Sequence, residues 1–267
     1  MIKRKTRLNS TPDMQVHAPH IHVPFELVDK HFDLIRKNRF DLEMFFGTKI
    51  FDSVTDRDIT DLKKKLDYSP RLSFHAPFMD LSPGAVDPEV RKVTMQRFSR
   101  TLDIADILKP TVIVFHSGYE KWKYAHSTNV WLEQSLKTWL PVNERAADIG
   151  VKVAIENVFE DEPDNLAALA REMDSPNFGL CFDTGHFNLF AKSSLLEWLR
   201  AVKSYMLEIH IHDNNTHADE HIVPGDGTFD FRTFFREIKG IEAVYTIEMH
   251  NIEDVIKSFE RIKTYME

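Results

Sequence analysis

Nine residues whose side chains can bind a divalent metal ion recur along this chain, each within a few residues of the end of a short apolar run. Imidazole and carboxylate groups together suit Zn²⁺, Mn²⁺ and related ions. One such residue would mean little, but a regularly placed set predicts a site for roughly one to three divalent ions, with Zn²⁺ or Mn²⁺ expected. The predicted ligands are His75, His116, Glu156, Asp183, His186, His210, Asp219, His221 and Glu248.

The elements that would position these ligands alternate between strand-like and helix-like patterns. The strand-like runs are mostly continuously apolar, as in a parallel sheet that is buried on both faces. Strands are predicted at 14–18, 40–46, 72–76, 111–115, 151–155, 178–182, 206–211 and 243–247. Helices are predicted at 24–38, 56–66, 87–108, 129–149, 165–173, 194–203, 231–239 and 252–265.

Eight strand–helix units with short connections predict an α/β fold, a single (β/α)₈ TIM barrel over residues 1–267, with residues 1–12 as a mobile N-terminal arm. A doubly wound open sheet is the alternative, but no Gly-rich phosphate-binding motif follows the first strand. In a barrel, side chains at the carboxyl ends of the strands converge on the axis. The segments that carry the predicted ligands contain no Lys or Arg, so a divalent cation is the expected partner of their carboxylates.

Composition limits the classes of function. The formal net charge of −8 disfavours broad attraction to nucleic acid, although two short basic clusters occur. The sequence has no apolar run of about 18 residues and no secretory signal, so neither membrane insertion nor export is predicted. Cys181 is the single cysteine, is expected in the core, and fits a reducing cytoplasm.

The roles of other polar residues near the strand ends can be interpreted in two ways. Glu43 contacts a sugar hydroxyl or is a buried acid satisfied by hydrogen bonds. The loop 223–231 is interpreted as a tight turn before a helix capped by Asp230, with anion binding by its backbone as the alternative. The remaining histidines are interpreted as polar rim residues, or else as residues that support the ligands or contact substrate: His17, His20, His22, His212, His217 and His250.

These motifs resemble those of the xylose isomerase-like barrel superfamily, which includes endonuclease IV. The resemblance runs from the second strand to the last and is carried by His-Ala-Pro-Phe, His-Ser-Gly, Ile-Glu-Asn, Asp-Thr-Gly-His, His-Ile-His-Asp, Asp-Glu-His and a terminal Glu. For the sugar epimerases and isomerases of the superfamily, it implies one metal held by Glu156, Asp183, His210 and Glu248. The two glutamates would also serve as acid and base around a metal-stabilised enediolate. The implied substrate contacts are His186, His75, Glu43 and His212.

Endonuclease IV resembles the chain in another way, because all nine positions of its three-zinc cluster have a counterpart here. Its motif after the first ligand histidine is longer, however, and its DNA-inserting loops have no clear equivalent. The leading hypothesis is therefore an isomerase or epimerase acting on a small sugar or sugar phosphate. The alternatives are a metal-dependent phosphoesterase like endonuclease IV and a noncatalytic sugar- or metal-binding barrel. A homo-oligomer is compatible with the sequence.

Overall fold

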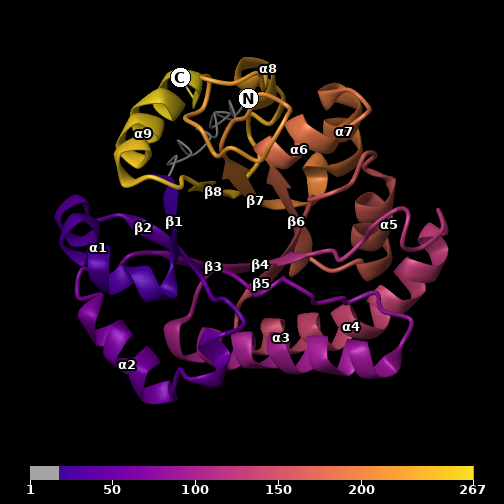
Figure 1. Ribbon diagram of the computed structural model, residues 1–267, viewed down its shortest axis with the longest axis horizontal. Coiled ribbons are helices and arrows are strands. Elements are labelled where there is room, and N and C mark those ends of the chain that lie inside the picture. The colour runs from indigo at the N-terminus through magenta and orange to yellow at the C-terminus, as the bar shows by residue number, and fades with distance from the viewer. Residues whose placement is uncertain (1–17, 267) are drawn as a thin grey trace, which may run out of the picture.

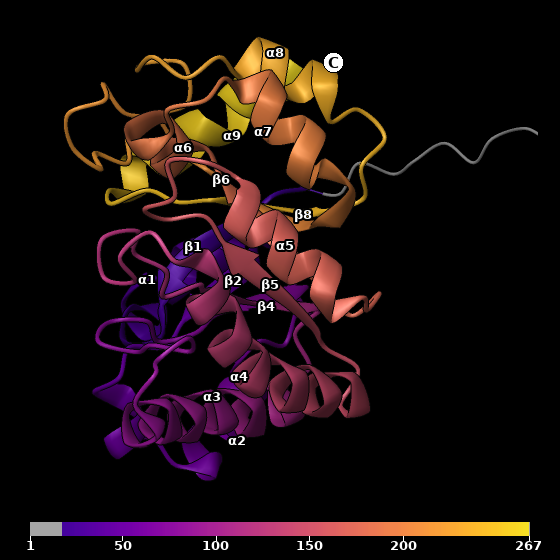
Figure 2. The same ribbon diagram turned by 90° about the vertical axis from the view of Figure 1, so that its right-hand side faces the viewer.

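The structure is a computed structural model that describes residues 18–266. In this part of the chain, eight parallel strands pair in sequence order and close into a barrel, with β1 also paired to β8. Helices surround the strands (Figures 1 and 2). The predicted (β/α)₈ barrel is confirmed. Its strands are His20–Pro24 (β1), Asp41–Phe45 (β2), Leu72–His75 (β3), Val112–His116 (β4), Lys152–Glu156 (β5), Phe178–Asp183 (β6), Met206–Ile211 (β7) and Val244–Ile247 (β8).

The helices begin where local sequence signals favour them. Asp87 caps α3 by accepting a hydrogen bond from the backbone N–H of Glu89, and Pro88 occupies the first helical position, as the sequence predicts. Among the described residues, no helix combines the length and the apolar character needed to cross a membrane. The helices are Phe25–Asn38 (α1), Asp56–Lys65 (α2), Pro88–Leu108 (α3), Thr128–Asp148 (α4), Asp164–Met173 (α5), Thr184–Phe190 (α6), Leu195–Val202 (α7), Phe231–Glu237 (α8) and Ile252–Met266 (α9), with short 3₁₀ turns at Ile50–Asp52 and Lys203–Tyr205.

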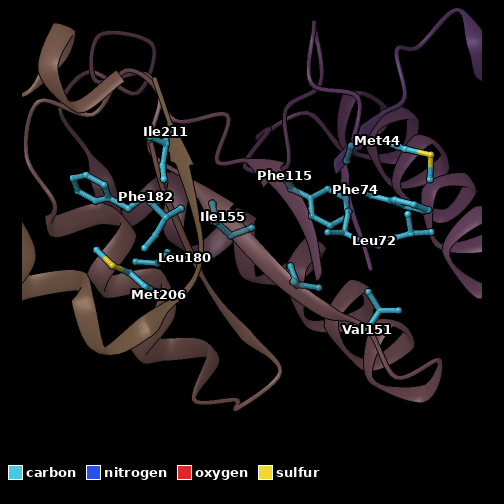
Figure 3. Packing of buried hydrophobic residues seen from close by; sticks show 14 of the residues in the cluster. Met44, Leu72, Phe74, Phe115, Val151, Ile155, Leu180, Phe182, Met206 and Ile211 are labelled. Atoms are coloured by element: carbon cyan, nitrogen blue, oxygen red, sulfur yellow. The ribbon is translucent and has the colours of Figure 1, made fainter. Parts of the chain in front are cut away.

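Side-chain alternation along the strands separates two apolar clusters. Phe115 packs against Trp139 of α4 and belongs to the large core between the strands and the helices, part of which Figure 3 shows. Val112 and Val114 instead join a small inner cluster that includes Cys181. Burial raises the pKa of the Cys181 thiol well above its usual value, which fits the core role predicted for it. The same alternation continues along β4 to His116, so its side chain points to the inner face.

One predicted element was misplaced, and one helix was not predicted. The first strand was predicted at 14–18, but residues 14–17 lie outside the described part of the chain, and β1 is His20–Pro24. The arm predicted at 1–12 also lies outside it. Helix α6 was not predicted; it starts directly after Asp183, whose carboxylate accepts a hydrogen bond from the backbone N–H of His186. The segment has only seven residues and begins Thr-Gly-His, so it carries no apolar repeat long enough to mark a helix.

Candidate metal centre

The predicted ligands come together at one end of the barrel. Strand register places His116 beside Glu156 and Asp183 beside His210, while Glu248 directly follows β8. In each pair the side chains lie on the same face of the sheet, because paired residues of neighbouring strands point the same way. Every one of the nine predicted ligands has a side-chain atom within 3.6 Å of another member of the set. Barrel closure therefore gathers residues that are far apart in sequence.

His210 lies among three carboxylates that are, like His210 itself, potential metal ligands. Its Nδ1 is 3.6 Å from Glu156 Oε1, 3.7 Å from Asp183 Oδ2 and 3.4 Å from Glu248 Oε1. This nitrogen is buried and has no hydrogen-bond partner in the described structure. A tetrahedral zinc site with bonds of about 2.1 Å has ligand–ligand separations of about 3.4 Å, close to the spacing here. The unpartnered nitrogen and three converging carboxylates thus fit a divalent cation.

Glu43 fixes the orientation of the His210 ring. Glu43 Oε2 lies 3.0 Å from His210 Nε2 and is completely buried, so it accepts the Nε2–H of the imidazole. In the neutral form of the ring, which is the form that binds a metal ion, the lone pair of Nδ1 then faces the three carboxylates. His22 Nδ1 lies 2.8 Å from the other oxygen of Glu43 and 3.0 Å from Glu248 Oε1. Burial lowers the pKa of His22, but Glu248 and Glu43 overcome this effect and raise it to about 10.

Replacing Glu43 with glutamine is expected to weaken metal binding without removing a ligand. The amide cannot stabilise the His210 tautomer as the carboxylate does, and loss of such support lowers metal affinity by about 10- to 100-fold. Competition with a chelating dye measures the dissociation constant. Glu26→Gln on the exposed surface of α1 is the matched control. Equal affinities for wild type and Glu43→Gln would contradict this role.

A second group of ligands meets on the other oxygen of Glu156. His75 Nε2 and His116 Nε2 lie 3.1 and 3.2 Å from Glu156 Oε2. His75 Nδ1 is 2.9 Å from the carbonyl oxygen of Ala76, which can only accept, so this nitrogen carries the proton. In the neutral ring, Nε2 then presents a lone pair to a carboxylate. Such an arrangement favours a cation or a proton between the two groups.

A third group forms at the loop after β7. Asp219 Oδ2 lies 3.3 Å from His186 Nε2 and 3.1 Å from His221 Nε2. The Nδ1 atoms of His186 and His221 each face a backbone carbonyl, from Asn157 and Glu248 respectively. These bonds fix both rings with Nε2 toward the carboxylate, as they do for metal-binding histidines.

Imidazoles keep the carboxylates of the centre ionised. Burial raises the pKa values of Glu156 and Glu248, but nearby histidines, His210 among them, lower both well below the usual value. Burial lowers the pKa of His210, while the acidic groups around it raise that pKa well above its ordinary value. Within residues 18–266, every ion pair of these two carboxylates is with histidine. The compensating charge is therefore imidazolium or a bound cation, and a divalent ion can replace the protons.

The structure corrects several assignments for residues outside the nine. His22 was interpreted as a rim residue, yet it contacts two acids of the centre. Glu43 and His212 were proposed to contact substrate, but neither lines the cavity above the centre. His212 is fully buried, 3.0 Å from Asp183 Oδ2, and stacks on the His221 ring. Because the first strand was misplaced, the sequence did not indicate that His22 lies on the same face of β1 as the buried His20.

The remaining histidines lie apart from the ligand groups. His20 is buried, and its Nδ1 is 2.9 Å from the Ser73 hydroxyl. His217 and His250 are exposed, with the His250 ring stacked on His221, so the rim interpretation holds for these two. His17 lies outside the described residues. Glu208 is also buried, and both burial and the Glu43 carboxylate raise its pKa well above the usual value.

Polar residues of the same motifs hold the strand ends together. The Asn157 side chain donates to the Asp183 carbonyl at 3.0 Å and accepts from the Asp183 backbone N–H at 2.9 Å. The Thr184 hydroxyl donates to the His212 carbonyl at 2.7 Å. These three bonds cross between the ends of neighbouring strands, at the level of the predicted ligands. They restrict the positions of the carboxylates that face His210.

Gly185 is required because His212 packs against its backbone. A Cβ at this position would lie 2.0 Å from His212 Cε1. Gly185→Ala is therefore expected to displace the ring and to lower the free energy of unfolding by about 1–3 kcal/mol. Urea denaturation measures this loss. Gly47→Ala is the control, because its added Cβ would make ordinary contacts of 3.7 Å or longer. A Gly185→Ala variant as stable as Gly47→Ala would contradict the packing argument.

The Gly-rich loop 223–231 is an internally satisfied turn. The backbone N–H groups of Gly225 and Gly227 donate to Asp213 Oδ2 at 2.9 and 3.0 Å, and that of Phe229 donates to Asp213 Oδ1. Asp230 accepts from the Thr233 N–H at the start of α8, as expected for its cap. The N–H groups bonded to Asp213 are engaged, so the turn interpretation holds.

A cavity of about 940 Å³ opens above the metal centre. The loops after β3 and β4 form much of its wall, and the Phe78 ring stacks on His116 with centroids 4.1 Å apart. Six of the predicted ligands also line the cavity: His75, His116, Glu156, His186, His221 and Glu248. A small molecule can therefore reach both Glu156 and Glu248, while Asp183 and His210 lie deeper.

Comparisons with known proteins agree with this architecture. A D-tagatose 3-epimerase-like protein has a solved structure with TM-score 0.78 and 28% identity, matching 92% of this chain and 97% of its own. A protein of Thermus thermophilus, TTHB071, soaked with ZnCl₂, has TM-score 0.78 and 23% identity, matching 93% of this chain and 98% of its own. A ketose 3-epimerase of Arthrobacter globiformis is 28% identical over 163 residues, which is 57% of this chain and 53% of that protein.

The model of one protein family, the xylose isomerase-like TIM barrel, matches residues 32–265. That range covers the barrel from α1 to α9 and includes all nine predicted ligands. Since the match covers most of the chain and the fold is the same, this protein belongs to the xylose isomerase-like TIM barrel family.

Proposed function

We propose that this protein is a divalent-metal-dependent sugar isomerase or epimerase in which Glu156 and Glu248 move a proton at a carbon next to a carbonyl. The observation that carries the proposal is the convergence of both glutamates, with Asp183, on His210 Nδ1 beneath one cavity. The sugar epimerase-like relatives support the substrate class.

The mixed imidazole and carboxylate donors suit Zn²⁺ or Mn²⁺, held by Glu156, Asp183, His210 and Glu248. A divalent ion bound there would supply Lewis-acid polarisation of a substrate carbonyl. The zinc-soaked Thermus structure shares the fold and is consistent with this choice of metal.

In the proposed reaction, the two glutamates act from different sides of the substrate. Glu156 ends β5 and Glu248 follows β8, so they reach the cavity from well-separated strands of the closed barrel. Both are ionised at neutral pH in the described structure, and each can accept a proton. One glutamate would remove the proton from carbon, and the other, after taking up a proton from solvent, would donate that proton to the opposite face, which inverts the centre. The first glutamate would then release its proton to solvent. His186 and His75 also line the cavity and would position substrate oxygens.

Solvent isotope exchange tests this function directly. Purified protein loaded with Zn²⁺ or Mn²⁺ is incubated in D₂O with a panel of ketohexoses and ketopentoses. We expect deuterium at one carbon next to the carbonyl, together with the epimeric or isomeric sugar, both read by NMR. A panel that shows neither deuterium incorporation nor sugar conversion with either metal would overturn the proposal.

A second candidate is a phosphoesterase with a multinuclear site. The observation that favours it is the presence of two further ligand groups, His75 with His116, and His186 with Asp219 and His221. A one-metal isomerase does not need them as ligands. Metal analysis separates the two candidates: two or three tightly bound ions per chain favour hydrolysis, whereas one favours isomerisation. Cleavage of a duplex with an abasic site tests the DNA version.

A further inference from the structure

The cavity has an outer part that the proposed proton transfer does not use. It is built from the loop after β3, which carries Ser82, and the loop after β4, which carries Lys123 and Tyr124. We propose that these three residues form a subsite for a phosphate group at the far end of a sugar substrate. This inference rests on the proposed function and narrows its substrate class to sugar phosphates.

Lys123 supplies a cation that the protein leaves without an acidic partner. Its Nζ lies 3.0 Å from the Ser82 hydroxyl and 5.5 Å from the centre of the Tyr124 ring. Within residues 18–266, Lys123 makes no ion pair with a carboxylate, whereas Lys121, two residues earlier, is 2.6 Å from Asp161. An unpaired ammonium group beside a ligand cavity is a common means of binding phosphate.

The Tyr124 hydroxyl is a buried donor that lacks a partner. The residue is 7% exposed and lines the cavity, yet its hydroxyl oxygen makes no hydrogen bond in the described structure. Burial raises the pKa of Tyr124, and the Ser82 hydroxyl, which lies nearby but not at ordinary hydrogen-bond distance, partly offsets this, so the phenol stays protonated. Buried hydroxyls are normally satisfied, and an orphan at a cavity wall indicates a ligand acceptor. A phosphate oxygen would satisfy it.

Other charged groups face the same space and do not outweigh these donors. Asp80 and Glu120 line the cavity and are exposed, as Lys123 is, so water and salt screen the repulsion by the acids and the attraction by the lysine alike. The Tyr124 hydroxyl is buried, so its hydrogen bond to an anion would not be weakened in this way. Asp87 accepts the Glu89 N–H at the start of α3 and is also exposed. Among the cavity-lining residues of the described chain, Lys123 is the single lysine or arginine.

Cavity size and the Gly-rich loop also support this location. Ligand cavities usually range over about 300–1,000 Å³, so about 940 Å³ leaves room for a group beyond a bare monosaccharide. The Gly-rich loop 223–231 was the other candidate for anion binding, but its N–H groups at Gly225 and Gly227 already bond to Asp213. The outer subsite is therefore where the structure offers free donors.

Binding measurements test the subsite without depending on turnover. Isothermal titration calorimetry of the metal-loaded full chain compares a ketohexose with its terminal phosphate monoester. We expect the phosphate ester to bind about tenfold tighter or more, as charge-assisted hydrogen bonds allow. Lys123→Met should reduce this preference to about twofold while leaving the affinity for the neutral sugar unchanged. Lys121→Met, which removes a paired lysine outside the cavity, should retain the full preference.

Tyr124→Phe is a second variant that tests the subsite even if Lys123→Met does not fold. Because the hydroxyl has no partner in the protein, its removal should leave the melting temperature unchanged while weakening binding of the phosphate ester. Equal binding of the two ligands by wild type, no binding of the ester at millimolar concentration, or a preference that survives Lys123→Met would each overturn the subsite. Deuterium exchange is measured separately, so that the two proposals can fail independently. If the phosphate ester binds more tightly through Lys123 but no sugar exchanges deuterium, the subsite stands and the epimerase function is rejected. If deuterium exchanges but the phosphate ester binds no more tightly, the epimerase function stands and the subsite is rejected.

Discussion

Replacing Glu156 with glutamine is expected to lower the kcat for sugar isomerisation by about 10²- to 10⁴-fold, and Glu248→Gln should do the same. Glutamine keeps an oxygen that can face the metal, but its amide cannot accept and return a proton at neutral pH. Both side chains line the cavity, and both point to the same nitrogen of His210. The loss should therefore appear in kcat while metal content changes less.

Kinetics and metal analysis on the same preparations check this prediction. Glu162→Gln is the control, because this exposed acid lies in the loop after β5 and outside the cavity. If either active-site glutamine variant exchanges substrate hydrogen with solvent at the wild-type rate, that glutamate is not part of the proton-transfer pair. If both lose metal completely, the loss of activity reports on binding rather than on proton transfer, and the assigned roles fail.

Binding of a divalent ion is expected to raise the melting temperature by about 10 °C. A ligand present at about 1,000 times its dissociation constant stabilises the native state by about 4 kcal/mol. In a chain of this size, each kcal/mol corresponds to about 2–4 °C. The physical source is the relief of repulsion between Glu156, Asp183 and Glu248, which surround His210 Nδ1 at 3.4–3.7 Å.

Thermal denaturation with and without a chelator measures this shift. His210→Ala should abolish it, because the nitrogen on which three carboxylates converge is gone. His126→Ala removes an exposed histidine of the loop after β4 and should leave the shift intact. A melting temperature that does not respond to Zn²⁺ or Mn²⁺ in the wild-type chain would contradict the metal centre.

Much of the fold was predictable because each unit carries its own signals. Strands such as β4 and β5 are continuously apolar, and Asp87-Pro88 marks the start of α3. The prediction of the first strand failed because His20 and His22 interrupt the apolar character of β1. They do so because they point into a polar interior, which local hydrophobicity cannot reveal. Helix α6 was not predicted because it is short, Thr184–Phe190, and begins Thr-Gly-His without an apolar repeat.

The sequence by itself determined the chemistry that is available: acids and imidazoles at the ends of strands, with few competing cations nearby. Only the tertiary structure decided which of them lie around one atom, as three carboxylates do around His210 Nδ1. It also decided which residues orient others, as Glu43 orients the His210 ring. The reason is physical. Strand alternation is local and can be read along the chain, but the separation of two groups across a closed barrel depends on the register and twist of every strand between them.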